Sequence, residues 1–90
     1  MFSKDIIINY IQYTIKAPSS IVGKKYDVFL GSKYLLSFGI LNQSHYKDRL
    51  GIYSSNDNMN TVSRDLYRLK NKKFGRDTTS PIYWSKRYLW

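Results

Sequence analysis

A single histidine and a few scattered carboxylates are the side chains of this chain that could do acid-base chemistry. His45 lies three residues before Asp48, and a carboxylate at that distance could orient the imidazole as a general base. The pair lies in a polar loop, where a hydrogen bond that fixes the loop is the simpler interpretation. No Gly-rich phosphate loop, paired carboxylates or Ser-His-Asp spacing is present. The sequence therefore predicts that the protein is not an enzyme.

The composition does not support metal or cofactor chemistry either. The chain contains no Cys, one His and no Glu, and its six acidic residues are all Asp. One imidazole and isolated Asp residues cannot fill a four-coordinate metal site, and no disulfide can form. We expect no metal, no cofactor and no small-molecule substrate.

The basic residues point to an acidic partner. Lys and Arg number 15 against 6 acids, which gives a formal net charge of +9. A run from Lys70 to Arg76 holds four cations and no acid, which suits contacts with phosphates. A solvated helix end, where cations favour the helix dipole, is the alternative. The predicted contact residues, for nucleic acid or an acidic protein shell, are Arg64, Arg68, Lys70, Lys72, Lys73 and Arg76.

The clearest element that could position these residues is a β-hairpin. Residues 24–30 and 33–38 are strand-like, and Gly31-Ser32 between them fits a type II′ turn. That register puts two apolar sets on opposite faces of the ribbon. One set is Phe29, Tyr34, Leu36 and Phe38, and the other is Tyr26, Val28 and Leu35.

The segment before the hairpin is harder to assign. Residues 5–16 are rich in β-branched and aromatic side chains, which favours one strand. The alternative is a helix, since one helical face would hold Ile7, Ile8, Ile11 and Ile15. Residues 1–22 are therefore predicted to be an N-terminal arm or edge strand. Residues 40–60 are expected to be a loop.

Two helices are expected after this loop. The first begins near Asn60 or Thr61 and ends before Gly75, with Val62, Leu66 and Leu69 in one apolar stripe. The second has Ser80 as its N-cap and Pro81 at its first position. Leu66, Leu69 and Trp84 are predicted to lie in the core, with Phe29, Tyr34, Leu36 and Phe38.

Aromatic residues gather at the end of the sequence. The chain has nine Tyr, four Phe and two Trp, more than so short a domain can bury. Tyr and Trp are enriched at protein interfaces. We predict a protein interface made by Tyr83, Arg87, Tyr88, Leu89 and Trp90. The alternative is that Leu89 and Trp90 close the domain's own core.

These elements predict a small α+β single domain. Its β-hairpin, or a three-stranded antiparallel sheet if the N-terminal segment joins, would be packed by two short helices. The basic α+β domain spans residues 23–90. The longest purely apolar run is Ile6-Ile7-Ile8, far below the roughly 20 residues of a membrane span, so no membrane contact is expected.

Three motifs in this order resemble a known family. They are the hairpin that closes on Ser37-Phe38-Gly39, the loop from His45 to Asp48 before a basic helix, and the ending from Ser80 to Trp90. Together they resemble small basic proteins of unknown function from tailed phages and giant DNA viruses. The similarity covers roughly residues 24–90, and the chain departs from the family pattern at Lys70-Asn71, where the family usually has an Arg-His pair.

The resemblance implies a viral protein found in the virion, and in the host cytoplasm before assembly. The function expected from it is a minor structural protein of the capsid or tail. Such a protein would bind neighbouring shell subunits in a multi-copy assembly and could also touch the packaged genome as nonspecific DNA. The alternative is a nucleic-acid-binding accessory protein, viral or ribosomal, that acts through the basic helix.

Overall fold

The computed structural model describes residues 1–74 and 77–90, and it divides them into two compact units. Met1–Leu41 forms the first unit and Asn42–Trp90 the second. Strands make up the first unit and helices the second, so the predicted α+β class is confirmed.

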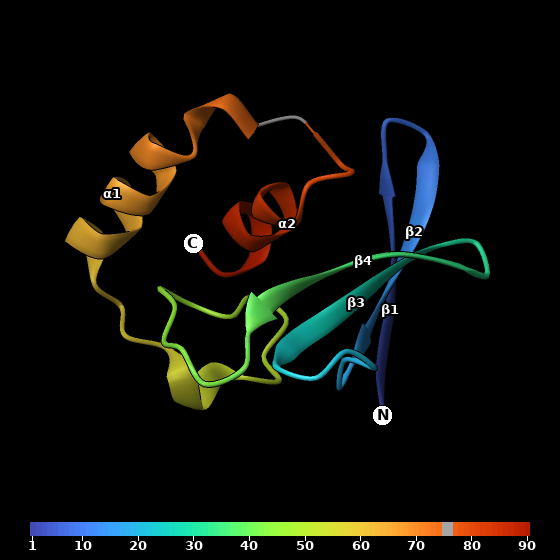
Figure 1. Cartoon of the computed structure of the whole chain (residues 1–90), viewed down its shortest axis with the longest axis horizontal. Coiled ribbons are helices and arrows are strands. Elements are labelled where there is room, and N and C mark those ends of the chain that lie inside the picture. Colours follow the sequence, from blue (N-terminus) through green and yellow to red (C-terminus); the bar gives the residue numbers. More distant parts are fainter. Residues whose placement is uncertain (75–76) are drawn as a thin grey trace. The chain divides into compact units, whose positions relative to one another are not determined.

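The first unit is an antiparallel sheet in the order β1-β2-β3-β4 (Figure 1). Its strands are β1 (Phe2–Ile8), β2 (Ile11–Ala17), β3 (Lys24–Leu30) and β4 (Lys33–Ile40). The prediction of a single N-terminal strand is wrong, because residues 1–22 contain the two strands β1 and β2. The second of these lies inside the sheet, and β1 is its edge.

A tight turn that the sequence analysis missed joins β1 to β2. Ile8 pairs with Ile11, and both residues between them have positive φ, 51° at Asn9 and 66° at Tyr10. Two consecutive positive φ values define a type I′ turn, which favours Asn-Gly. Asn9 fits this preference, whereas Tyr10 does not, and so the turn is hidden within a run of strand-forming residues.

Tyr10 offers a simple test of this turn. Its side chain is fully exposed, so replacing it loses no packing. A left-handed conformation costs a residue with a Cβ about 1 kcal/mol. We expect Tyr10→Gly to raise the melting temperature by about 4–8 °C, as measured by circular dichroism. Asn9→Gly is the control and should have a smaller effect, since Asn tolerates this conformation. An unchanged melting temperature in Tyr10→Gly would contradict the turn.

The hairpin of β3 and β4 closes as predicted. Leu30 pairs with Lys33, which leaves Gly31-Ser32 as a two-residue loop. Gly31 has a φ of 64°, and Ser32 is not among the residues with positive φ, which is the pattern of a type II′ turn.

A β-bulge changes which residues share a face of this hairpin. Val28 pairs with Leu36, yet the next residue, Phe29, pairs with Tyr34, so Leu35 is the extra residue. One extra residue reverses the alternation of side chains beyond it. The predicted grouping of Phe29 and Tyr34 with Leu36 and Phe38 is therefore wrong.

The face that results carries the buried apolar side chains of the sheet. Cross-strand pairing puts Ile15 beside Val28, Val28 beside Leu36, and Tyr26 beside Phe38. The Tyr26 and Phe38 rings stack with centroids 5.2 Å apart. Buried on this face are Tyr13, Ile15, Ala17, Tyr26, Val28, Leu36 and Phe38. On the other face, Tyr34 is 41% exposed, which is why its predicted core position is wrong, and Phe29 is only half-buried.

A buried carboxylate ties the β2–β3 connection to the sheet. Asp27 is 2% exposed, and its Oδ1 accepts hydrogen bonds from the hydroxyls of Ser19 (2.5 Å) and Ser37 (2.6 Å). Its Oδ2 accepts from the backbone N–H (2.8 Å) and the hydroxyl (2.7 Å) of Ser20. Burial alone would raise the pKa of Asp27, but these hydrogen bonds outweigh it and lower the pKa below its ordinary value.

The second unit contains the helices. They are the short 3₁₀ helices η1 (Ser54–Asn56) and η2 (Lys72–Phe74), and the α-helices α1 (Thr61–Lys70) and α2 (Pro81–Tyr88). Both α-helix starts are confirmed. The Asn60 side chain accepts a hydrogen bond from the Ser63 N–H, and the Ser80 hydroxyl accepts one from the Ile82 N–H.

Trp84 is the central residue of the second unit. Its side chain is fully buried, and its indole Nε1 donates a hydrogen bond of 2.9 Å to the Thr78 carbonyl. The Tyr88 ring stacks on it with centroids 6.4 Å apart. The predicted core positions of Trp84, Leu36 and Phe38 are confirmed.

Candidate functional site

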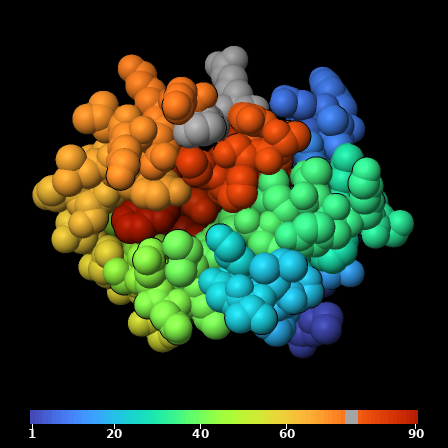
Figure 2. All heavy atoms as spheres, in the orientation of Figure 1, coloured from blue at the N-terminus to red at the C-terminus, as the bar shows by residue number. Residues whose placement is uncertain are grey.

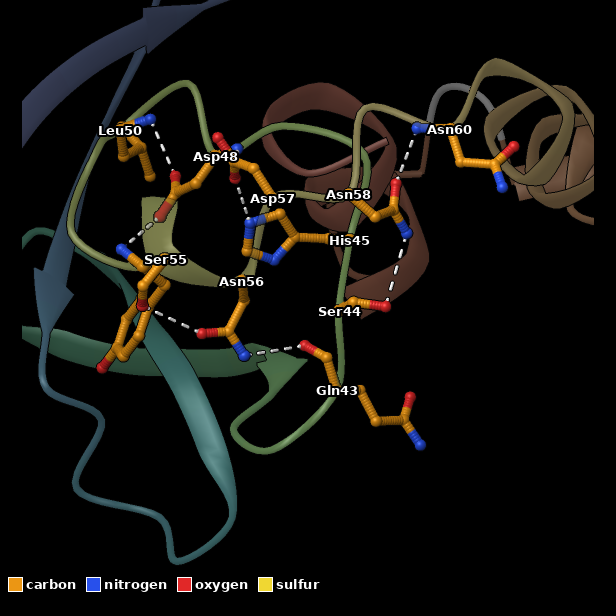
Figure 3. Close-up of polar contacts among 11 residues, drawn as sticks. Gln43, Ser44, His45, Asp48, Leu50, Ser55, Asn56, Asp57, Asn58 and Asn60 are labelled. Carbon is orange, nitrogen blue, oxygen red and sulfur yellow. Dashed lines mark hydrogen bonds and ion pairs between the residues drawn. The ribbon is translucent and has the colours of Figure 1, made fainter.

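The histidine of the polar loop is a buried structural residue. His45 is 1% exposed, and its Nε2 lies 2.6 Å from Oδ1 of Asp57 (Figure 3). The same carboxylate oxygen accepts a hydrogen bond of 2.8 Å from the Asp48 N–H. The backbone around His45 is also hydrogen-bonded to the backbone around Asp57. The His45 N–H donates to the Asn56 carbonyl, and the Asn58 N–H donates to the His45 carbonyl.

Asp48, the partner expected for His45, holds the loop in another way. Its carboxylate is buried and accepts hydrogen bonds of 2.8 Å from the N–H groups of Leu50 and Tyr53 (Figure 3). Asp57, which the sequence analysis did not single out, supports the imidazole instead. These buried groups fix the loop of residues 43–60, as the simpler interpretation of His45 predicts.

The part of the chain that the structure describes contains no cluster of side chains that could bind a metal ion. Within residues 1–74 and 77–90, no group of three or more His or Asp side chains lies close enough to hold a metal ion. The same residues contain no helix with the length and apolar character needed to cross a bilayer.

Helix α1 presents its apolar side to solvent. The stripe of Val62, Leu66 and Leu69 is 67%, 61% and 70% exposed, so the predicted core positions of Leu66 and Leu69 are wrong. We call these three residues the α1 stripe. The helix packs on its own unit through polar and aromatic side chains instead: Tyr67 stacks on Trp90 at 4.7 Å, and the Arg64 guanidinium lies over the Tyr46 ring at 4.8 Å.

The predicted basic contact residues fall into separate groups. Arg64 is engaged within its own unit, over Tyr46 and 3.1 Å from a carboxylate oxygen of Asp65. Lys70, Lys72 and Lys73 are exposed around the end of α1. Arg76 lies outside the described residues.

Arg68 is the predicted contact residue that lines a cleft. The cleft has a volume of about 380 Å³, and its other lining residues, Tyr83, Lys86 and Arg87, come from α2. A hydrogen bond with the Tyr88 hydroxyl raises the pKa of Arg87 above its ordinary value, so this guanidinium stays charged. Lys86 was missed by the sequence analysis. The Ser80-Pro81 helix start could have found it, since positions 83, 86 and 87 share one face of a helix that begins there.

The predicted interface at the end of the sequence is divided between interior and surface. Tyr88 is 7% and Leu89 is 1% exposed. The Lys47 N–H donates to the Leu89 carbonyl at 3.0 Å, and the Arg49 N–H donates to that of Tyr88 at 2.9 Å. Figure 2 shows the last residues, in red, between α1 in orange and the loop around residue 45 in green. The alternative that Leu89 closes the domain's own core therefore describes this segment, and Tyr83 and Arg87 remain at the surface.

Trp90 completes the contact between this segment and α1. Its ring is parallel to that of Tyr67, with an interplanar angle of 13°. Arg68 Nε donates a hydrogen bond of 2.9 Å to the Trp90 carbonyl oxygen. Burial raises the pKa of the Tyr67 phenol above its ordinary value, although a hydrogen bond with Ser85 acts in the opposite direction.

The α1 stripe and the basic cleft are two features on the surface of the described residues that could bind a partner. No protein-family description, characterised protein or solved structure matches this chain.

Proposed function

We propose that this chain is a minor structural protein of a virus particle that binds neighbouring shell subunits through the α1 stripe. The exposure of Val62, Leu66 and Leu69 on one side of a helix carries the proposal. Apolar side chains grouped on an exposed helix face mark binding surfaces for other proteins. The viral part of the proposal rests on the resemblance to small basic viral proteins. Three motifs carry it: the hairpin that closes on Ser37-Phe38-Gly39, the loop from His45 to Asp48, and the ending from Ser80 to Trp90.

The charges around the stripe indicate the kind of partner. Lys70 and Lys72 are exposed just beyond Leu69, and the chain carries a net charge of +9. A second copy would bring the same positive charge to the interface, which opposes self-association. The occupant is therefore an acidic surface of a different subunit, with an apolar patch that covers Leu66 and Leu69.

The test replaces part of the stripe. In Leu66→Gln/Leu69→Gln, incorporation into particles should fall at least tenfold, because an interface hot spot contributes about 2 kcal/mol or more. The stability of the isolated protein should change by less than about 0.5 kcal/mol, since both side chains are exposed. Incorporation is measured by quantitative mass spectrometry of purified particles, and folding by circular dichroism.

Val22→Gln is the matched control. Val22 is a fully exposed apolar residue of the first unit, and this variant should assemble normally. Normal incorporation of the double variant would contradict the role of the α1 stripe. Absence of the unaltered protein from purified particles would contradict the structural role itself.

A further inference from the structure

The basic cleft combines cations from two helices. Arg68 comes from α1, and Lys86 and Arg87 come from α2, together with the phenol of Tyr83. The cleft has a volume of about 380 Å³ and is open to solvent. Like charges held close together repel one another, and an anion bound in the cleft would relieve this repulsion.

Two of these cations donate hydrogen bonds to main-chain oxygens. Lys86 Nζ donates to the Asn71 carbonyl at 3.2 Å, and Arg68 Nε donates to the Trp90 carbonyl oxygen. Arg87 Nε lies 3.4 Å from the Tyr88 hydroxyl, a weak contact, and its guanidinium lies 5.7 Å from the centre of that ring. The ion pairs of His45 with Asp57 and of Arg64 with Asp65 do not involve the cleft.

These contacts also orient the cations. Arg68 uses Nε for Trp90, which leaves its Nη groups to donate elsewhere, and Lys86 has further protons on Nζ. A guanidinium can donate two parallel hydrogen bonds to the oxygens of a phosphate, and a phenol can donate a third or stack on a base.

We propose that Arg68, Tyr83, Lys86 and Arg87 form a phosphate-binding site for the backbone of single-stranded nucleic acid. The site is distinct from the α1 stripe, because Arg68 lies about half a turn around α1 from Leu66. It also differs from a site on the basic run from Lys70 to Arg76, since three of its four residues belong to α2. The chain can therefore bind a phosphodiester at the cleft while a protein partner covers the stripe.

Charge removal at the cleft tests this inference. Fluorescence anisotropy measures binding of a fluorescein-labelled dT12 oligonucleotide to the full chain and to Lys86→Gln and Arg87→Gln, at several salt concentrations. Each substitution should weaken binding about fivefold at 0.1 M salt and reduce the slope of log K against log[salt] by about 0.7. Tyr83→Phe should weaken binding without a change in slope, because it removes a hydroxyl and no charge.

Two variants serve as controls. Lys33→Gln removes an exposed lysine at the start of β4, and should leave affinity and slope close to those of the unaltered chain. Lys86→Arg keeps the charge and should retain binding. Circular dichroism of every variant establishes that the fold is intact.

The outcomes separate the sources of phosphate. If inorganic phosphate displaces dT12 no better than chloride at equal ionic strength, the result supports a site for the nucleic-acid backbone. Displacement by millimolar phosphate, beyond a chloride control of equal ionic strength, would show a site for free phosphate and overturn the nucleic-acid assignment. Equal affinities and slopes for Lys86→Gln, Arg87→Gln and Lys33→Gln would overturn the site itself, since general charge would then explain the binding.

Discussion

A chain truncated after Arg87 is expected to lose the folded structure of its remaining second-unit residues, 42–87. The truncation removes Leu89, which is 1% exposed, and Tyr88, which stacks on Trp84. It also removes the carbonyls that accept hydrogen bonds from Lys47 and Arg49. Loss of a buried Leu side chain alone costs about 2–5 kcal/mol, a large part of the stability of a small domain. Near-ultraviolet circular dichroism and amide hydrogen exchange measure the loss.

A matched pair of leucines gives this prediction its control. Leu89→Ala should destabilise the second unit by about 2–5 kcal/mol. Leu69→Ala, at a position that is 70% exposed, should cost less than about 0.5 kcal/mol. Equal effects of the two substitutions, or a truncated chain with native amide protection in residues 42–87, would contradict the internal role of the final segment.

Asp27→Ala is expected to destabilise the sheet by about 3 kcal/mol, because it leaves the Ser20 N–H and three hydroxyls without their acceptor. Asp5→Ala is the control. Asp5 is exposed and accepts one hydrogen bond of 2.8 Å from the Thr14 hydroxyl, so its loss should cost less than about 0.5 kcal/mol. Urea unfolding at neutral pH measures both variants, and a cost for Asp27→Ala no larger than for Asp5→Ala would contradict the role of the cluster.

The same carboxylate makes stability depend on pH. The pKa of Asp27 is lower in the folded state than its ordinary value of 3.8, so the folded chain favours the ionised form. This contribution is fully present above the ordinary pKa, and it is lost as the pH falls through the lower folded value. Asp27→Asn should lack this part of the acid destabilisation when unfolding is measured between pH 6 and pH 2. If the stability of Asp27→Asn depended on pH as that of the unaltered chain does, groups other than Asp27 would account for the acid destabilisation.

The elements that local sequence could predict are those with local physical causes. The Gly31-Ser32 turn follows from the positive φ that Gly allows at the first turn position. The helix starts follow from side chains that accept hydrogen bonds from N–H groups two or three residues later, as Asn60 and Ser80 do. These signals act over a few residues, so no tertiary contact is needed to find them.

The β1–β2 turn and the bulge at Leu35 could not be found in this way. Tyr10 has a high strand propensity and still adopts a left-handed conformation, which the pairing of β1 with β2 imposes. The bulge has no Gly or other local marker, yet it decides that Leu36 and Phe38 are on the buried face with Val28. Pairing between strands, rather than propensity, sets both features.

For the candidate site, the net charge of +9, the lack of thiolate ligands and the clustering of Tyr and Trp near the end can be read from the amino-acid composition and order. Composition fixes these properties whatever the fold. Three features depend on how the chain folds: Asp57 supports His45, the α1 stripe faces solvent, and Arg68 meets Lys86 and Arg87 at one cleft. A helical period identifies which side chains share a face, but the direction of that face depends on what the rest of the chain packs against it. Here the Trp90 ring packs on Tyr67, which fixes that side of α1 inward and leaves Leu66 and Leu69 outward.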